Sequence, residues 1–113
     1  MRRMFFQLAP AIILICFAIL VFSLSLRAQS DVAKTYKTNC VLCHAADGSG
    51  STASGKAMKA KDLKSPEVQG KSDAELAEFI TQGKGKMPAF GKKLKPEDIK
   101  QLVAYTRDMA AKK

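Results

Sequence analysis

Cys40-Val41-Leu42-Cys43-His44 (CVLCH) is the stretch of sequence that decides the fold. Its pattern, C-x-x-C-H, is the attachment signature of a c-type haem. Residues three apart share one face of a helix, so both thiols can reach the two vinyl groups along one edge of a porphyrin. His44 is the chain's only histidine, and it follows where its imidazole can bind the iron. The pentapeptide therefore predicts one covalently attached haem c.

Three other interpretations of these residues are weaker. A zinc site needs about four nitrogen, sulfur or carboxylate ligands, and no second cysteine or histidine pair follows this one. A redox dithiol of the thioredoxin kind would stand beside a strand-helix-strand pattern, whereas no strand-like alternation follows. A disulfide between Cys40 and Cys43 would close a very short loop and add little stability.

A basic start and a long apolar run precede the motif. Arg2 and Arg3 come first, Ala11 to Phe22 (AIILICFAILVF) is apolar throughout, and residues 23–28 (SLSLRA) include small residues suited to cleavage. This is the layout of a secretory signal peptide. Leu8 to Leu26 spans nineteen mostly apolar residues, near the ~20 that cross a bilayer, so an uncleaved membrane anchor over residues 5–26 stays open.

The chain of 113 residues therefore divides into two parts. We expect residues 1–28 to be a signal peptide or N-terminal membrane anchor and residues 29–113 to be one small domain. With the N-terminal segment cleaved or kept as an anchor, we expect the domain in the periplasm or another extracytoplasmic compartment. Free thiols tend to oxidise there, and thioether bonds at Cys40 and Cys43 would remove that liability.

The exported part has the patterns of helices separated by loops. Asp31 can cap a first helix, whose apolar face carries Val32, Tyr36 and both motif cysteines. A glycine- and serine-rich loop is expected from Ala45 to Gly55, followed by at most one helical turn before Leu63.

Three further helices have start and stop signals. Ser65-Pro66-Glu67 opens a short helix that ends by Gly70. Ser72 to Glu75 (SDAE) is a capping box, and its helix ends at Gly83. Pro96 begins the last helix. Its expected apolar face carries Ile99, Leu102, Val103, Tyr105, Thr106 and Ala110.

The second iron ligand is predicted in the loop from Gly83 to Phe90 (GKGKMPAF). Pro88 favours an extended backbone at Met87, and the glycines allow the chain to pass close to a ring. A thioether is a soft neutral donor that raises the reduction potential of haem. We therefore expect His44 and Met87 as the two axial ligands, with Met58 as the competing methionine and an open position as the third option.

The chain resembles the class I monohaem cytochrome c family over nearly all of residues 29–113. The resemblance rests on Tyr36-x-x-x-Cys40-x-x-Cys43-His44, on the Gly83–Phe90 loop and on Leu102-Val103-Ala104-Tyr105. Small bacterial periplasmic carriers and algal-type photosynthetic carriers look most similar. The resemblance implies an all-α domain of about four helices wrapped around one haem. It further implies that the first and last helices cross, with Leu102 and Tyr105 packed against Tyr36.

Two positions depart from the family pattern. Val32 stands four residues before Tyr36, where the family usually has glycine. Ala53 stands where many members have a proline whose carbonyl accepts the proton of the proximal histidine. The carbonyl of Ala53 is expected to accept it here.

A haem with both axial positions filled leaves one-electron transfer as its chemistry. We therefore expect an electron carrier and not an enzyme, acting between extracytoplasmic or membrane redox partners. The alternatives are a haem c subunit of a membrane oxidase or dehydrogenase complex and a ligand-binding or peroxidatic haem protein.

The charge of the chain bears on its partners. The net charge is +9, and five lysines surround the Met87 loop. They are Lys84, Lys86, Lys92, Lys93 and Lys95. These lysines favour redox partners with acidic docking patches. The export signal argues against nucleic acid as a partner, and we expect a monomer, with membrane association only through the N-terminal segment.

Overall fold

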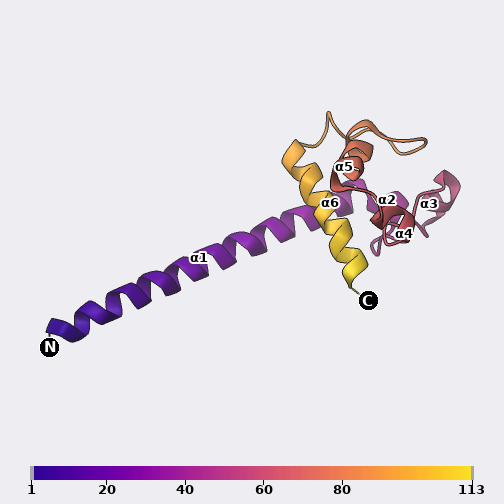
Figure 1. Cartoon of the computed structure of the whole chain (residues 1–113). Helices are drawn as coiled ribbons and strands as arrows, with labels where there is room; N and C mark the ends of the chain where they lie inside the picture. The colour runs from indigo at the N-terminus through magenta and orange to yellow at the C-terminus, as the bar shows by residue number, and fades with distance from the viewer. Residues whose placement is uncertain (1, 113) are drawn as a thin grey trace. The chain divides into compact units, whose positions relative to one another are not determined.

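The computed structural model describes the backbone of residues 2–112, and their side chains except at residues 2–9, 25, 28 and 30. The chain separates into two compact units, Met1–Asp31 and Val32–Lys113. Six helices are found in the described range (Figure 1), with a single isolated β-bridge between Lys84 and Met87. They are α1 (Arg2–Asn39), α2 (Val41–His44), α3 (Ala53–Met58), α4 (Pro66–Gln69), α5 (Asp73–Gln82) and α6 (Pro96–Ala111). The expected all-α class is confirmed.

Helix α1 differs from the expected first helix at its start. Asp31 was expected to cap that helix, but it lies inside the continuous helix α1. No glycine or proline interrupts the sequence between Leu26 and Asn39. Its alanine, arginine, glutamine and lysine residues favour helix, so nothing local ends one helix and begins another.

Helices α4 and α5 start and stop at the residues that their sequences predict, whereas α2 and α3 do not. The Ser65 side chain accepts a hydrogen bond from the Val68 N–H at the start of α4. Ser72 and Glu75 form both bonds of the capping box at the start of α5, and Gly83 ends that helix. Helix α3 begins at Ala53, two residues before the expected end of the preceding loop, because the Thr52 hydroxyl caps it.

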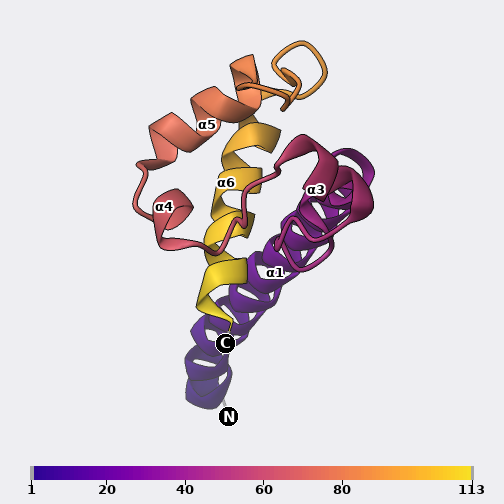
Figure 2. The ribbon, with the colours of Figure 1, turned by 90° about the vertical axis from the view of Figure 1, so that its right-hand side faces the viewer.

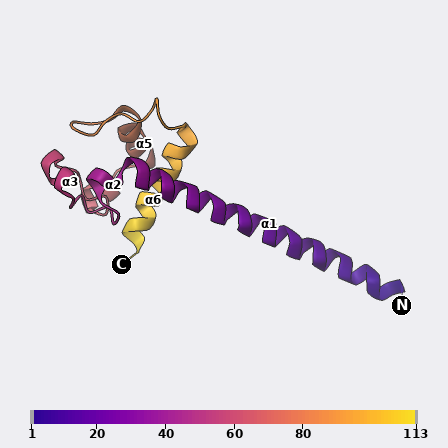
Figure 3. The same cartoon turned by 180° about the vertical axis from the view of Figure 1, so that it is seen from behind.

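Helix α6 is the central packing element of unit 2. Its residues Ile99, Leu102, Val103 and Thr106 are buried. On one side Leu102 packs with Val32 and Tyr36 from the last part of α1. Figure 3 shows α6 beside this part of α1. On the other side Val103 packs with Val68 of α4 and Leu76 of α5, and Figure 2 shows α4 and α5 along this side. The expected contact between the first and last helices is confirmed.

Val32 and Tyr105 complete that contact. Val32 is only 8% exposed and belongs to the same cluster as Leu102, so α6 packs against a valine side chain where the family usually has glycine. The rings of Tyr36 and Tyr105 lie 5.3 Å apart, centroid to centroid, with planes tilted by 52°. A tilted arrangement at this separation is favourable for aromatic rings.

Unit 1, residues 2–31, is helical and exposes large apolar side chains. Ile13, Leu14 and Phe22 are each 68% exposed. In the part of the chain that the structure describes, no helix meets the length and hydropathy needed to cross a membrane.

Candidate functional site

One pocket in unit 2 brings together most of the residues that the sequence assigns to a haem site. It lies between the end of α1, α2, α5, α6 and the loop before α6. Its lining residues are Tyr36, Cys40, His44, Leu63, Ile80, Met87, Phe90, Leu94, Leu102 and Thr106. His44 and Met87 are 43 positions apart in sequence, yet they border the same pocket.

The lining of this pocket is almost wholly apolar. Thr106 is its one hydroxyl residue besides Tyr36, and the Thr106 hydroxyl donates to the carbonyl of Val103 within α6, at 2.7 Å. The Tyr36 hydroxyl donates to the carbonyl of Ala45 at 2.8 Å. Both polar groups are thus satisfied by backbone, so the pocket offers sulfur, imidazole and hydrocarbon to an occupant.

The two motif cysteines have different surroundings. Cys40 is the residue before α2 and lines the pocket, whereas Cys43 lies within α2 and is half-buried. Cys43 is not a lining residue of the pocket. Burial, followed by the nearby Cys43, raises the pKa of the Cys40 thiol to about 11. The Cys40 side chain therefore prefers its neutral state in this environment.

His44 is oriented by a backbone carbonyl. Its Nδ1 lies 3.2 Å from the carbonyl oxygen of Lys61. Burial lowers the pKa of His44, and the bond to Lys61 opposes this shift only in part. The neutral ring with its proton on Nδ1 leaves Nε2 free to act as a ligand. The family resemblance led us to expect the carbonyl of Ala53 as the acceptor for His44. In the structure the acceptor is instead the carbonyl of Lys61.

The path of the chain through α3 explains why the carbonyl of Lys61, and not that of Ala53, accepts the bond from His44. Ala53 is the first residue of α3, so its carbonyl belongs to the backbone of that helix. The chain then leaves α3 through Lys59, which has a φ of +55°. Lys61 comes two residues later, and its carbonyl reaches His44.

The haem-motif helix α2 is held by the loop that follows it. The Gly50 N–H donates to the His44 carbonyl at 2.9 Å. The Thr52 hydroxyl donates to the Leu42 carbonyl at 2.7 Å and lies 3.3 Å from that of Cys43. The same hydroxyl accepts from the Gly55 N–H, so one side chain joins the end of α2 to the start of α3.

The Met87 loop has its own backbone structure. Lys84 and Met87 exchange two backbone hydrogen bonds, at 3.2 and 3.0 Å, and so form a tight hairpin. Gly85 in the turn has a φ of +59°, which glycine adopts readily. Beyond the hairpin, the N–H of Phe90 bonds to the carbonyl of Ile80, which fixes the loop to the end of α5.

Met58 is placed differently from Met87. It is 48% exposed at the end of α3 and is not a lining residue of the pocket. Met87 is half-buried and lines the pocket. The geometry therefore favours Met87 over Met58 as the sulfur donor.

Sequence reasoning missed three groups that shape the site: Thr52, the Lys61 carbonyl and a polar network around Arg107. Thr52 precedes Ala53-Ser54-Gly55, and a threonine before a helix is a recognisable cap signal. Nothing in the local sequence marks the Lys61 carbonyl or Arg107, because their partners lie far along the chain.

The donor set fits a haem c. A flat apolar cofactor needs an apolar pocket, a neutral imidazole on one side and a second ligand of suitable softness on the other. This pocket has that lining, together with His44 and Met87. Thiols at Cys40 and Cys43 stand within the same short segment.

Comparisons with known proteins agree with this fit. A family model described as cytochrome C oxidase, cbb3-type, subunit III matches residues 27–105. Cytochrome c6 of Nostoc sp. is 37% identical over 108 residues, covering 93% of this chain and 91% of that protein. The solved structure of the KustC0563 c-type cytochrome is 34% identical with a TM-score of 0.63, covering 68% of this chain and 94% of that one.

One further relative is much longer than this chain. The cbb3-type cytochrome c oxidase subunit CcoP of Azospirillum brasilense is 35% identical over 89 residues. The match covers 76% of this chain but only 30% of that subunit. The helical fold, the pocket and these relatives together show that this chain belongs to the c-type cytochrome family and is an electron carrier with a covalently bound haem c.

Proposed function

We propose that Cys40 and Cys43 hold the haem through thioether bonds and that His44 and Met87 are its axial ligands. The observation that carries this proposal is the shared pocket, an apolar space bordered by both His44 and Met87. The bond from His44 to the Lys61 carbonyl, at 3.2 Å, supports ligation through Nε2. The hairpin at Lys84–Met87 supports Met87 by presenting its side chain from a fixed backbone.

The haem, when bound, supplies reversible one-electron chemistry. The residues around the haem set its reduction potential. The apolar lining excludes water, and a thioether donor favours the ferrous state, so both raise the reduction potential. With both axial positions filled, the domain has no open position for a substrate, and we propose that it has no enzymatic activity of its own.

The proposed role is to carry electrons between redox partners outside the cytoplasmic membrane, as a monomer. Arg2, Arg3 and the following apolar run support export, with residues 1–28 as signal peptide or anchor and residues 29–113 as the cytochrome domain. Acidic docking patches on the partners would suit the lysines that surround the Met87 loop. Lys84, Lys86, Lys92, Lys93 and Lys95 are all exposed.

A second candidate is a haem subunit of a membrane oxidase complex. The match of residues 27–105 to the cbb3-type subunit III model favours it. The chain covers only 30% of the CcoP subunit, which leaves most of that protein without a counterpart. We therefore rank this candidate second. Co-purification of the chain with an oxidase core at fixed stoichiometry would favour it, and recovery of the chain alone would favour the carrier.

The ligand assignment is tested by the weak far-red absorption band of sulfur-to-iron charge transfer. The ferric protein should have this band, Met58→Ala should keep it, and Met87→Ala should lose it. Ferrous Met87→Ala should also bind carbon monoxide, whereas the unmodified ferrous protein should not. Loss of the band in Met58→Ala, with the band kept in Met87→Ala, would contradict the assignment. Binding of carbon monoxide by the unmodified protein would instead favour a ligand-binding haem protein.

The fate of the N-terminal segment needs a separate measurement. Mass spectrometry of the purified mature protein gives the haem content and the first residue together. A mass equal to that of a haem-bearing chain whose first residue is near 29 would establish cleavage. A full-length mass with recovery in the membrane fraction would establish the anchor over residues 5–26.

A further inference from the structure

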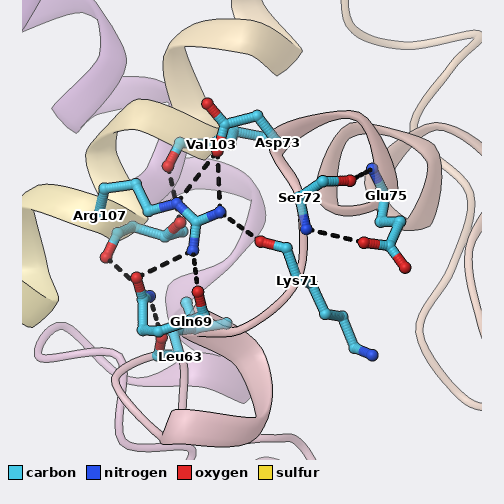
Figure 4. A network of polar contacts seen from close by, with 9 residues as sticks. Leu63, Gln69, Lys71, Ser72, Asp73, Glu75, Val103 and Arg107 are labelled. Carbon is cyan, nitrogen blue, oxygen red and sulfur yellow. Dashed lines mark hydrogen bonds and ion pairs between the residues drawn. The ribbon is translucent and has the colours of Figure 1, made fainter.

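Arg107 is the centre of a polar network that joins α6 to the last residue of α4, the first residue of α5 and the segment between them (Figure 4). Its guanidinium donates to the carbonyl of Gln69 at 2.9 Å and to the Gln69 side-chain oxygen at 3.0 Å. It also donates to the carbonyl of Lys71, and two of its nitrogens reach Asp73 Oδ1, at 2.8 and 3.1 Å. The Arg107 side chain is 29% exposed, so the network is partly shielded from water.

The network has an outer and an inner branch. The outer branch consists of the bonds from Arg107 to Lys71 and Asp73, and the Asp73 side chain is 76% exposed. The inner branch passes through the Gln69 side chain. Because its Oε1 accepts from Arg107, its Nε2 faces the other way and donates to the carbonyl of Leu63 at 2.7 Å. The carbonyl of Thr106 lies 3.4 Å from the same nitrogen.

The inner branch ends on the wall of the haem pocket. Leu63 and Thr106, whose carbonyls accept from Gln69, both have side chains that line the pocket. Leu63 is held on its other side by the bond from its N–H to the carbonyl of Gly48, at 2.8 Å. Leu63 belongs to neither α3 nor α4. Its place in the pocket wall therefore depends on these two bonds and on side-chain packing.

We propose that Arg107, acting through Gln69, is a positioning residue that keeps Leu63 on the haem pocket and thereby keeps the reduction potential high. The proposal rests on the haem site proposed above. Water that enters a haem pocket stabilises the more highly charged ferric state, so a pocket wall that excludes water raises the potential. The planar fork of arginine suits this role, because it bonds in several directions at once and fixes the orientation of the Gln69 amide.

The two branches allow the positioning role to be separated from a general loss of stability. Gln69→Met keeps the length of the side chain but removes the bonds to Leu63 and Thr106, while Arg107 keeps its bonds to Lys71 and Asp73. Asp73→Ala does the reverse, because it removes the outer acceptor and leaves Gln69 in place. Arg107→Lys keeps the positive charge but loses the planar fork, because one ammonium group cannot bond in the same several directions.

Three measurements on the haem-loaded protein decide the proposal. Amide hydrogen exchange at Leu63 reports local opening of the wall. The reduction potential reports its effect on the haem. The unfolding midpoint in denaturant shows whether Gln69→Met and Asp73→Ala lose comparable stability.

The expected result is an amide exchange rate at Leu63 about five- to tenfold faster in Gln69→Met, as suits the loss of one hydrogen bond. The potential should fall in the same variant, and Arg107→Lys should shift both readouts in the same direction. Asp73→Ala should change neither, even if its unfolding midpoint drops. Equal changes in Asp73→Ala, or unchanged exchange and potential in Gln69→Met, would overturn the proposal.

The far-red band keeps this test distinct from that of the axial ligands. A band that persists in Gln69→Met shows that the potential fell with Met87 still bound. If the unmodified protein lacks the band, the ligand assignment fails, and the exchange rate at Leu63 still decides whether Gln69 holds the wall. If Gln69→Met does not fold, the comparison of Arg107→Lys with Asp73→Ala gives the same decision.

Discussion

The hydroxyl of Tyr36 donates a hydrogen bond of 2.8 Å to the carbonyl oxygen of Ala45, the residue that directly follows His44. Tyr36 is only 3% exposed, and burial, with a smaller effect of Cys40, raises the pKa of its phenol far above the ordinary value. The phenol therefore keeps its proton at neutral pH and remains a donor. The bond ties the last part of α1 to the end of the haem motif.

Tyr36→Phe should lower the free energy of unfolding by about 1 kcal/mol, the usual net value of one hydrogen bond. The loss should stay modest because the Ala45 carbonyl keeps a second donor, the Gly48 N–H at 3.3 Å. Denaturant titration of the haem-loaded protein measures the change. A loss above about 3 kcal/mol would indicate that the ring had also moved from Tyr105.

Gly55→Ala should prevent normal packing of the haem motif. A Cβ at this position would lie 2.1 Å from the carbonyl oxygen of Cys43 and 2.4 Å from that of Gly50, and both are backbone atoms. We expect a loss of about 3 kcal/mol or more and a lower yield of haem-loaded protein. Gly70→Ala is the control, since its Cβ would approach only the Pro66 carbonyl, at 3.0 Å. Its effect should stay within about 1 kcal/mol, and similar losses for both variants would contradict the packing argument.

Removal of the motif cysteines should remove the covalent haem stepwise. Acid-acetone extraction should leave haem on the unmodified polypeptide, Cys40→Ala should keep one thioether, and the double variant at Cys40 and Cys43 should release all haem. Circular dichroism of that double variant should show much less helix, because few side chains of unit 2 are buried by the polypeptide itself and a flat apolar cofactor would supply the rest of the core. Helix content equal to that of the unmodified protein would show that the polypeptide core suffices.

The capping box of α5 should contribute stability that disappears in acid. The bond from the Ser72 N–H, followed by that from its hydroxyl, lowers the pKa of Glu75 below its ordinary value of 4.5. A carboxylate with a lowered pKa in the folded state stabilises the fold above about pH 4.5, and this contribution is lost as the pH falls through the folded-state value. Glu75→Gln should therefore reduce the loss of stability between pH 6 and pH 3.

The same substitution at Glu78 is the matched control for that measurement. Glu78 lies on the same helix and outside the capping box. Unfolding free energies at several pH values give the slope for each variant. Identical slopes for Glu75→Gln and the unmodified protein would show that the box does not respond to pH.

Charge reversal around the Met87 loop should slow electron transfer to an acidic redox partner. The triple variant with glutamate at Lys84, Lys86 and Lys93 should show a lower bimolecular rate constant. The difference from the unmodified protein should shrink as salt shortens the range of charge. A triple variant at Lys34, Lys100 and Lys112, which are also exposed, has the same net charge and serves as control. Equal rates for the two variants would argue against docking at this loop.

Most of the fold could be predicted from the sequence because its signals are local. Ser65, Ser72 and Pro96 mark helix starts through groups within three residues, and the structure has helices at these positions. The contact of Tyr36 with Leu102 and Tyr105 was expected from the family resemblance and is confirmed. His44 and Met87, which were expected from the haem motif and from the Gly83–Phe90 loop, border one pocket, while their role as ligands stays a prediction.

The predictions from sequence are wrong where contacts between residues far apart in the sequence decide the structure, or where no glycine or proline ends a helix. Asp31 has the chemistry of a helix cap, but a cap acts only where the helix ends, and α1 continues through it. The acceptor for His44 could not be placed from the sequence, because Lys61 lies 17 residues away across a loop whose path depends on α3. The partners of Arg107 lie 34 to 38 residues away, so no sequence window contains the network.

The hairpin at Lys84–Met87 has a consequence for the speed of ligand exchange. Its two backbone bonds join Lys84 to Met87 and so do not depend on the proposed bond from Met87 to the haem iron. If the sulfur of Met87 leaves its partner, the backbone that carries it can therefore stay in place. Return of the sulfur is then an intramolecular event, with an effective concentration in the millimolar range or above. In the site proposed above, this local concentration would favour rebinding of the Met87 sulfur over a weakly binding small molecule, so the loop would protect the cofactor from foreign ligands of low affinity.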